Sequence, residues 1–167
     1  MKRSEFLKSL GLSSGALMSI YCLGGLTSCA SESPQPNTNT GGNNGGGNTV
    51  AGFTGNAKTS AGKISFTLDL TTDNFKSLLT EGSYLYPNSG DVIVAKVKGG
   101  GFVALSKACT HQGTTVTYRL NQNDFYCDNH GSEFSTTGSV ENGPATAGLT
   151  VYSASLNTTT NVLTVSA

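Results

Sequence analysis

Both histidines of this chain, and two of its four cysteines, lie in two short blocks. Residues 109–113 read Cys-Thr-His-Gln-Gly, and residues 127–132 read Cys-Asp-Asn-His-Gly-Ser. Fifteen residues lie between His111 and Cys127. Each block offers one thiol and one imidazole, which are the side chains that bind soft and borderline metals. A fold that brings the blocks together would place two sulfur and two nitrogen ligands at one site.

The two blocks are open to three simple interpretations. Cys109 and Cys127 could form a structural disulfide, which an exported compartment permits, although the paired histidines would then have no role. A zinc site of two cysteines and two histidines is a second possibility. Zinc fingers usually pair cysteine with cysteine and histidine with histidine, whereas here each block is mixed. Chance placement of all four residues is the third.

The two blocks also resemble the signature of the Rieske iron-sulfur family. That signature is Cys-x-His, a spacer and Cys-x-x-His, commonly with Thr and Gly in the first block and His-Gly-Ser in the second. The resemblance implies one Rieske-type 2Fe-2S cluster, with Cys109 and Cys127 on the inner iron and His111 and His130 on the outer iron. It further implies an all-β fold, a Rieske-type antiparallel β-sandwich with a small cluster-binding subdomain of two loops.

Neighbouring residues extend the resemblance. Ser132 matches the family serine whose hydroxyl group hydrogen-bonds a cluster sulfide, so it is a candidate cofactor-binding residue. Gly143-Pro144-Ala145 resembles the family's proline loop, which covers a third side of the cluster. Gly113 and Gly131 follow the ligand histidines, where a side chain would obstruct a loop turn or a close backbone approach.

The sequence departs from the family pattern at three positions. Thr114 and Asn129 stand where members from cytochrome bc-type complexes carry a disulfide between the two loops. Phe134 stands where high-potential members have a tyrosine, so one hydroxyl donor to the cluster is missing. Because fewer donors stabilise the reduced cluster less, we predict a lower reduction potential than that of the disulfide-bearing and tyrosine-bearing members.

The remaining sequence predicts short strands and many turns. Charged residues make up 12% of the chain, and glycine is abundant with 22 residues, a composition that suits an all-β domain better than a helical one. Residues 73–79 predict one short helical turn with Phe75, Leu78 and Leu79 on one face, and residues 98–100 predict a hairpin turn. Apolar patterning predicts strands at residues 64–70, 91–97, 101–105, 116–118, 125–126, 149–152 and 162–165.

The N-terminus has the pattern of an export signal. Basic residues in the first eight positions precede an apolar run over residues 10–26, which four glycines interrupt. Residues 26–29, Leu-Thr-Ser-Cys, resemble the bacterial lipobox, after which lipid is attached to the cysteine. We therefore expect residues 1–28 to be a signal peptide, and Cys29 to carry a lipid that anchors the exported protein to a membrane, facing the periplasm or the cell surface.

The sequence after Cys29 predicts a tether followed by one domain. Residues 29–57 are rich in Gly, Asn and Thr, and cannot bury enough apolar surface to offset the entropy of ordering. Residues 58–167 are long enough for one domain with a real core. The formal net charge is zero, so nothing in the composition favours binding to nucleic acid.

These observations predict an electron-transfer protein, working as a membrane-tethered carrier or as a subunit of a quinol-oxidising or periplasmic oxidoreductase complex. Its partners would be redox proteins such as a cytochrome. Two alternatives are a Rieske ferredoxin that serves an oxygenase, and a zinc- or disulfide-stabilised surface lipoprotein with a binding role. No independent catalytic site is expected, because the mononuclear iron of a terminal oxygenase commonly needs two further histidines and a carboxylate, and both histidines of this chain lie in the two blocks.

Overall fold

The computed structural model describes residues 50–167. The predicted signal peptide over residues 1–28, the lipobox with Cys29, and most of the predicted tether lie outside these described residues. Within residues 50–167, no helix has both the length and the apolar character needed to cross a membrane.

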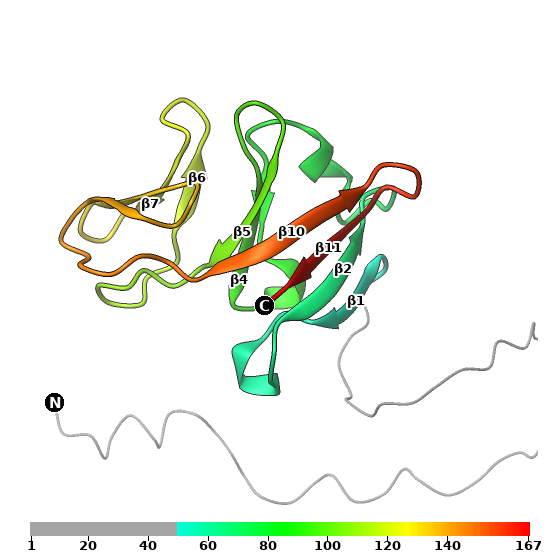
Figure 1. Cartoon of the computed structure of the whole chain (residues 1–167), viewed down its shortest axis with the longest axis horizontal. Helices are drawn as coiled ribbons and strands as arrows, with labels where there is room; N and C mark the ends of the chain where they lie inside the picture. Colours follow the sequence, from blue (N-terminus) through cyan, green and yellow to red (C-terminus); the bar gives the residue numbers. More distant parts are fainter. Residues whose placement is uncertain (1–49) are drawn as a thin grey trace, which may run out of the picture. The chain divides into compact units, whose positions relative to one another are not determined.

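A seven-stranded antiparallel sheet forms the larger part of the domain (Figure 1). Its first and last strands in the sequence are near neighbours, because β11 pairs with β2 and β2 pairs with β1. In spatial order the strands are β1 (Phe53–Asn56), β2 (Ser65–Asp69), β11 (Val162–Ser166), β10 (Val151–Asn157), β5 (Phe102–Ser106), β4 (Val92–Lys96) and β3 (Tyr84–Leu85).

A second, four-stranded antiparallel sheet lies to the left of β4 and β5 in Figure 1. Its strands follow the order of the sequence: β6 (Thr117–Arg119), β7 (Asp124–Cys127), β8 (Ser132–Ser135) and β9 (Val140–Asn142). An ion-pair network ties three of them, since the Arg119 guanidinium on β6 donates to Asp124 on β7 and to Glu133 on β8. Asp124 is buried, so this carboxylate needs the guanidinium as its partner.

Strand β4 connects two hydrophobic cores because its side chains alternate between its two faces. Val92 and Val94 pack into a core within the larger sheet. Ile93 and Ala95 pack into a second core that also contains both block cysteines. All four side chains are fully buried, which explains why this segment reads as a continuous apolar run. The arrangement is an antiparallel β-sandwich with few helical residues, as the sequence predicted.

The seven predicted strands correspond to β2, β4, β5, β6, β7, β10 and β11, whereas β3, β8 and β9 were not predicted. The predicted hairpin at residues 98–100 is confirmed, since β4 and β5 pair in register from Val92 with Ser106 to Lys96 with Phe102. The folded part, however, begins before the expected boundary at residue 58. Strand β1 pairs with β2, and Phe53 stacks on Phe66 with ring centroids 5.6 Å apart. Phe53 is the single apolar side chain of this strand, so no alternating pattern marked the segment.

The helical segments are three short 3₁₀ turns: η1 (Thr59–Ala61), η2 (Lys76–Leu79) and η3 (Pro87–Ser89). The predicted turn at residues 73–79 corresponds to η2, and Phe75 and Leu78 are buried as expected. The prediction that Leu79 lies on the same buried face is wrong. The exposed fraction of Leu79 is 52%. A 3₁₀ turn has three residues, which aligns Phe75 with Leu78 and directs Leu79 away.

Candidate cofactor site

The two blocks form loops at one end of the four-stranded sheet. Cys127 is the last residue of β7 and pairs with Ser132, the first residue of β8, so the second loop is a tight connection between two paired strands. The first loop leaves β5 and returns to β6 through an isolated bridge between Ala108 and Thr115. The Cys109 amide donates to the Thr114 carbonyl at 2.8 Å within this stem. Both cysteines therefore lie where paired backbone fixes their direction.

The two loops close with the same backbone turn. The Gly113 amide donates to the Cys109 carbonyl at 2.7 Å, and the Gly131 amide donates to the Cys127 carbonyl at 3.0 Å. Both glycines have a positive φ, 75° and 78°, which side chains disfavour. A Cβ at Gly113 would meet no atom within 4 Å. The first glycine is thus required by its conformation and not by a close approach.

Both cysteine side chains are free thiols and are buried, with exposed fractions of 3% for Cys109 and 2% for Cys127. Burial raises the pKa of the Cys127 thiol, and the adjacent Cys109 sulfur raises it further. At Cys109, burial also acts to raise the pKa, but hydrogen bonds from the backbone N–H groups of His111 and Gln112 contribute to a net lowering. Backbone N–H groups that point at sulfur stabilise thiolates, the form that binds metal.

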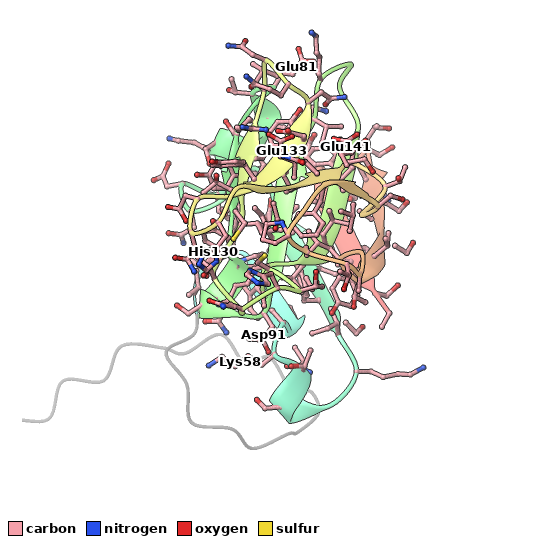
Figure 2. All side chains as sticks on the ribbon, turned by 90° about the vertical axis from the view of Figure 1, so that its left-hand side faces the viewer. Lys58, Glu81, Asp91, His130, Glu133 and Glu141 are labelled. Carbon is pink, nitrogen blue, oxygen red and sulfur yellow. The ribbon has the colours of Figure 1, made fainter. Side chains whose placement is uncertain are left out.

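The two histidines lie on the outside of the same site. His111 and His130 are exposed, and their ring centroids are 4.8 Å apart with the ring planes at 77°. Figure 2 shows His130 towards the opposite end of the molecule from Glu81. The site therefore has a buried pair of thiols and an exposed pair of imidazoles.

This arrangement of donors fits a two-iron group. In residues 50–167, no group of three or more His, Cys, Asp or Glu side chains surrounds a single point as the ligands of one ion would. The four donors instead form two pairs of different chemistry, the sulfurs inside and the nitrogens outside. A Rieske-type 2Fe-2S cluster requires two thiolates on one iron and two imidazoles on the other.

Ser132 lies behind the thiols and is fully buried. Its hydroxyl accepts a hydrogen bond of 3.0 Å from the Ala145 amide, and it contributes to lowering the pKa of the Cys109 thiol. Gly143-Pro144-Ala145 is therefore adjacent to the cysteines, where the resemblance to a proline loop placed it. In this structure the serine hydroxyl connects that segment to the sulfur site.

Two further hydroxyl groups at the loops were missed from the sequence. The Thr110 hydroxyl donates to the Ala147 carbonyl at 2.6 Å, and the Tyr86 hydroxyl donates to the Val116 carbonyl at 2.8 Å. Burial raises the pKa of Tyr86 to about 12, so its hydroxyl stays a donor. Thr110 lies inside the first block and could have been singled out, but the acceptors are backbone carbonyls, which no sequence pattern marks.

The three positions that depart from the family pattern have different surroundings. Phe134 is fully buried in the core that contains Cys109 and Cys127. Thr114 is half-buried and Asn129 is exposed. The hydroxyl that a tyrosine would bring at position 134 is therefore missing from the interior of the site, not from its surface.

A family model, the Rieske [2Fe-2S] domain, matches residues 69–153. Among characterised proteins, the chain is similar to cytochrome b6-f complex iron-sulfur subunits. It is 31% identical to that of Parasynechococcus marenigrum over 67% of this chain and 59% of the relative, and 30% identical to that of Chlorobaculum thiosulfatiphilum over 56% of this chain and 52% of the relative. The chain thus spans little more than half the length of these relatives.

Two solved structures are also similar. The plasma membrane Rieske protein PetC3 from Synechocystis PCC 6803 is 34% identical, with a TM-score of 0.41 over 46% of this chain and 76% of that one. The ferredoxin of carbazole 1,9a-dioxygenase from Nocardioides aromaticivorans IC177 is 19% identical, with a TM-score of 0.45 over 53% of this chain and 88% of that one. Because the family model covers slightly more than half of the chain and both blocks, the chain belongs to the Rieske [2Fe-2S] domain family, whose cofactor is one Rieske-type 2Fe-2S cluster.

Proposed function

We propose that this chain transfers electrons through a Rieske-type 2Fe-2S cluster whose inner iron is bound by Cys109 and Cys127 and whose outer iron is bound by His111 and His130. The observation that carries the proposal is the pairing of two buried, hydrogen-bonded thiols with two exposed imidazoles 4.8 Å apart. When bound, the cluster supplies a one-electron redox centre of raised potential.

The cysteines and the histidines have different roles at this site. The buried cysteines and Ser132 keep water away from the sulfur side and direct hydrogen bonds towards it. The exposed histidines bring the other side to the surface, which shortens the path to a redox partner. Both histidines of the chain are assigned to the cluster, so we attribute any enzymatic activity to a complex with other proteins.

The three loop segments nearest the two histidines carry almost no charge of their own, although Lys107, Glu133 and Glu141 flank them directly. Within residues 108–116, 127–132 and 142–149, Asp128 is the single Lys, Arg, Asp or Glu. Charged surfaces steer partners over a Debye length, about 8–10 Å at moderate salt. We infer that a partner meets this surface through short-range, uncharged contacts.

As the setting of this electron transfer, we propose a membrane-tethered carrier or a subunit of a quinol-oxidising or periplasmic oxidoreductase complex. The curated relatives are subunits of a cytochrome complex, and the N-terminal sequence has the pattern of an exported lipoprotein. A ferredoxin for an oxygenase is the second candidate, and an export signal argues against it because such systems usually work in the cytoplasm.

The reduced full-length chain is expected to show the electron paramagnetic resonance signal of a reduced Rieske cluster and to lose it on mixing with an oxidant. Stopped-flow rates with an anionic oxidant, ferricyanide, and with a cationic cobalt(III) complex should each change by less than about threefold between low and high salt, because the contact surface is nearly uncharged. A protein without the signal would contradict the proposed cluster. Rates that change by more than about tenfold in opposite directions would contradict the uncharged contact.

We further propose that residues 1–28 are removed on export and that Cys29 carries the lipid. A fatty-acid label supplied during growth is expected to enter the wild-type protein and to be lost in a Cys29→Ala variant, which should leave the membrane fraction. Cys22→Ala is the matched control, because Cys22 lies within the segment removed. Equal labelling of the Cys29→Ala variant would contradict this anchor.

A further inference from the structure

Two tyrosines at the β3 edge of the larger sheet pack against the core that contains both block cysteines. Strand β3 pairs with β4, with Tyr84 opposite Ala95, and successive side chains of a strand point to opposite faces. Leu85 accordingly packs against the core of the larger sheet, whereas Tyr84 and Tyr86 pack against the second core. Their ring centroids are 5.9 Å apart with the ring planes at 72°, the edge-to-face geometry that aromatic pairs favour.

The Tyr86 hydroxyl bonds to the stem of the first cluster loop. It donates a hydrogen bond of 2.8 Å to the carbonyl of Val116, the last residue before β6. The outgoing limb of the stem is fixed to the larger sheet separately, because the Lys107 amide donates to the Asp91 carbonyl at 2.9 Å. The Val116 amide donates to the Lys107 carbonyl at 2.8 Å and closes the stem two residues before Cys109. Tyr86 thus fixes the returning limb of the loop.

A third tyrosine joins the two sheets at the other end of the molecule. Tyr118, on β6, is buried, and its hydroxyl accepts a hydrogen bond of 2.9 Å from the Lys98 amide in the hairpin between β4 and β5. The same hydroxyl donates to the Asn123 side-chain oxygen at 2.6 Å in the turn between β6 and β7. The β4–β5 hairpin also bonds to Glu81, which Figure 2 shows towards the opposite end from His130. The Tyr118 bonds therefore lie away from the cluster loops.

We propose that Tyr86 is a positioning residue, which fixes the stem of the first cluster loop against the larger sheet, and that Tyr118 joins the same two sheets without acting on the loop. This inference rests on the proposed function only in assigning the first loop to a cluster. The stem leads directly into Cys109 and His111, so a stem with both limbs fixed gives these two donors one position. Without the Tyr86 hydroxyl, the returning limb keeps its bonds to the outgoing limb and loses its own bond to the larger sheet.

The test compares Tyr86→Phe, which keeps the ring and loses the hydroxyl, with Tyr118→Phe, which makes the same change at the other end. Because the Tyr118 hydroxyl makes two hydrogen bonds, its loss should lower the melting temperature at least as much. Cluster loss to an iron chelator is followed by visible absorption in the full-length protein. Tyr86→Phe is expected to lose its cluster roughly three- to tenfold faster than wild type, the effect of one hydrogen bond on a local opening equilibrium. Tyr118→Phe should lose its cluster at the wild-type rate.

The paramagnetic signal of the reduced cluster separates positioning from stability, because its line shape depends on where the ligands lie. We expect broader lines in Tyr86→Phe, in which the first loop takes a wider range of positions, and wild-type lines in Tyr118→Phe. Unchanged cluster loss in Tyr86→Phe would overturn the proposal, as would equally fast loss in Tyr118→Phe. Faster loss with a wild-type line shape would also overturn it, because Tyr86 would then stabilise the loop without positioning it.

Amide hydrogen exchange on the full-length chain without its cluster tests Tyr86 independently of the proposed function. The Val116 amide should exchange faster in Tyr86→Phe, and the Asn123 amide, which donates to the Arg119 carbonyl at 2.8 Å, should exchange faster in Tyr118→Phe. Unchanged exchange at Val116 would contradict the role of Tyr86 alone, also where Tyr86→Phe is isolated without a cluster. A wild-type chain without any cluster signal, together with the expected exchange, would contradict the proposed function alone.

Discussion

Replacing Cys127 with alanine is expected to give a folded chain that binds no 2Fe-2S cluster. The two cysteines are the free thiols of the described residues, so the variant leaves one thiolate where the inner iron requires two. Iron content per chain should fall to near zero, and the visible absorption and the paramagnetic signal of the reduced cluster should disappear. The β-sheet signal in far-ultraviolet circular dichroism should persist, because both sheets pair through backbone atoms that this change leaves in place.

A matched control separates loss of a ligand from loss of packing. Val116 is fully buried in the same core as Cys127, and Val116→Ala removes apolar volume without removing a sulfur. Truncation of a buried aliphatic side chain destabilises a domain by about 1–3 kcal/mol, so this variant should melt at a lower temperature and still carry the cluster. A Cys127→Ala protein with full iron content and an unchanged signal would contradict the assigned ligand.

Replacing Phe134 with tyrosine is expected to raise the reduction potential of the cluster by about 20–60 mV. A hydrogen bond is worth about 0.5–1.5 kcal/mol net, and 59 mV corresponds to a tenfold change for a one-electron couple. Phe134 is fully buried in the core that contains both cysteines, so the new hydroxyl would lie in the interior of the site, where a donor stabilises the reduced form. Redox titration followed by circular dichroism measures the shift.

Phe66→Tyr is the control for this change. Phe66 is also buried, with an exposed fraction of 2%, but lies in the other core. A buried hydroxyl without a partner costs about 1–3 kcal/mol, so this variant should lose stability and keep its potential. If Phe134→Tyr behaves in the same way, with a lower melting temperature and an unchanged potential, position 134 does not tune the cluster.

The sequence predicted most of the strands whose side chains pack into a core, because burial imposes a pattern on them; the exception is β8, which was not predicted although Phe134 is fully buried. Residues 64–70 alternate and form β2, and the apolar run over residues 91–97 forms β4. Strand β1 and the exposure of Leu79 were not predictable in this way. Phe53 is the single apolar side chain of β1, so no alternating pattern marks it, and a tighter turn than the α-helix changes which residues share a face.

At the candidate site, too, some features follow from the sequence and others only from the tertiary structure. The sequence by itself determined which four donors are available, because thiols and imidazoles are chemically specific and occur together in just two blocks of this chain. It also determined the turns that place them, since Gly113 and Gly131 have a backbone conformation that other residues disfavour.

The tertiary structure alone decided which donors are buried and what connects the loops. Strand pairing places the thiols in a core and leaves the imidazoles at the surface. The bond from Thr110 to Ala147 joins residues 37 apart in sequence through a backbone carbonyl. Every residue has such a carbonyl, so the sequence cannot indicate which one is used; only the folded path of residues 143–149 brings it to the first loop.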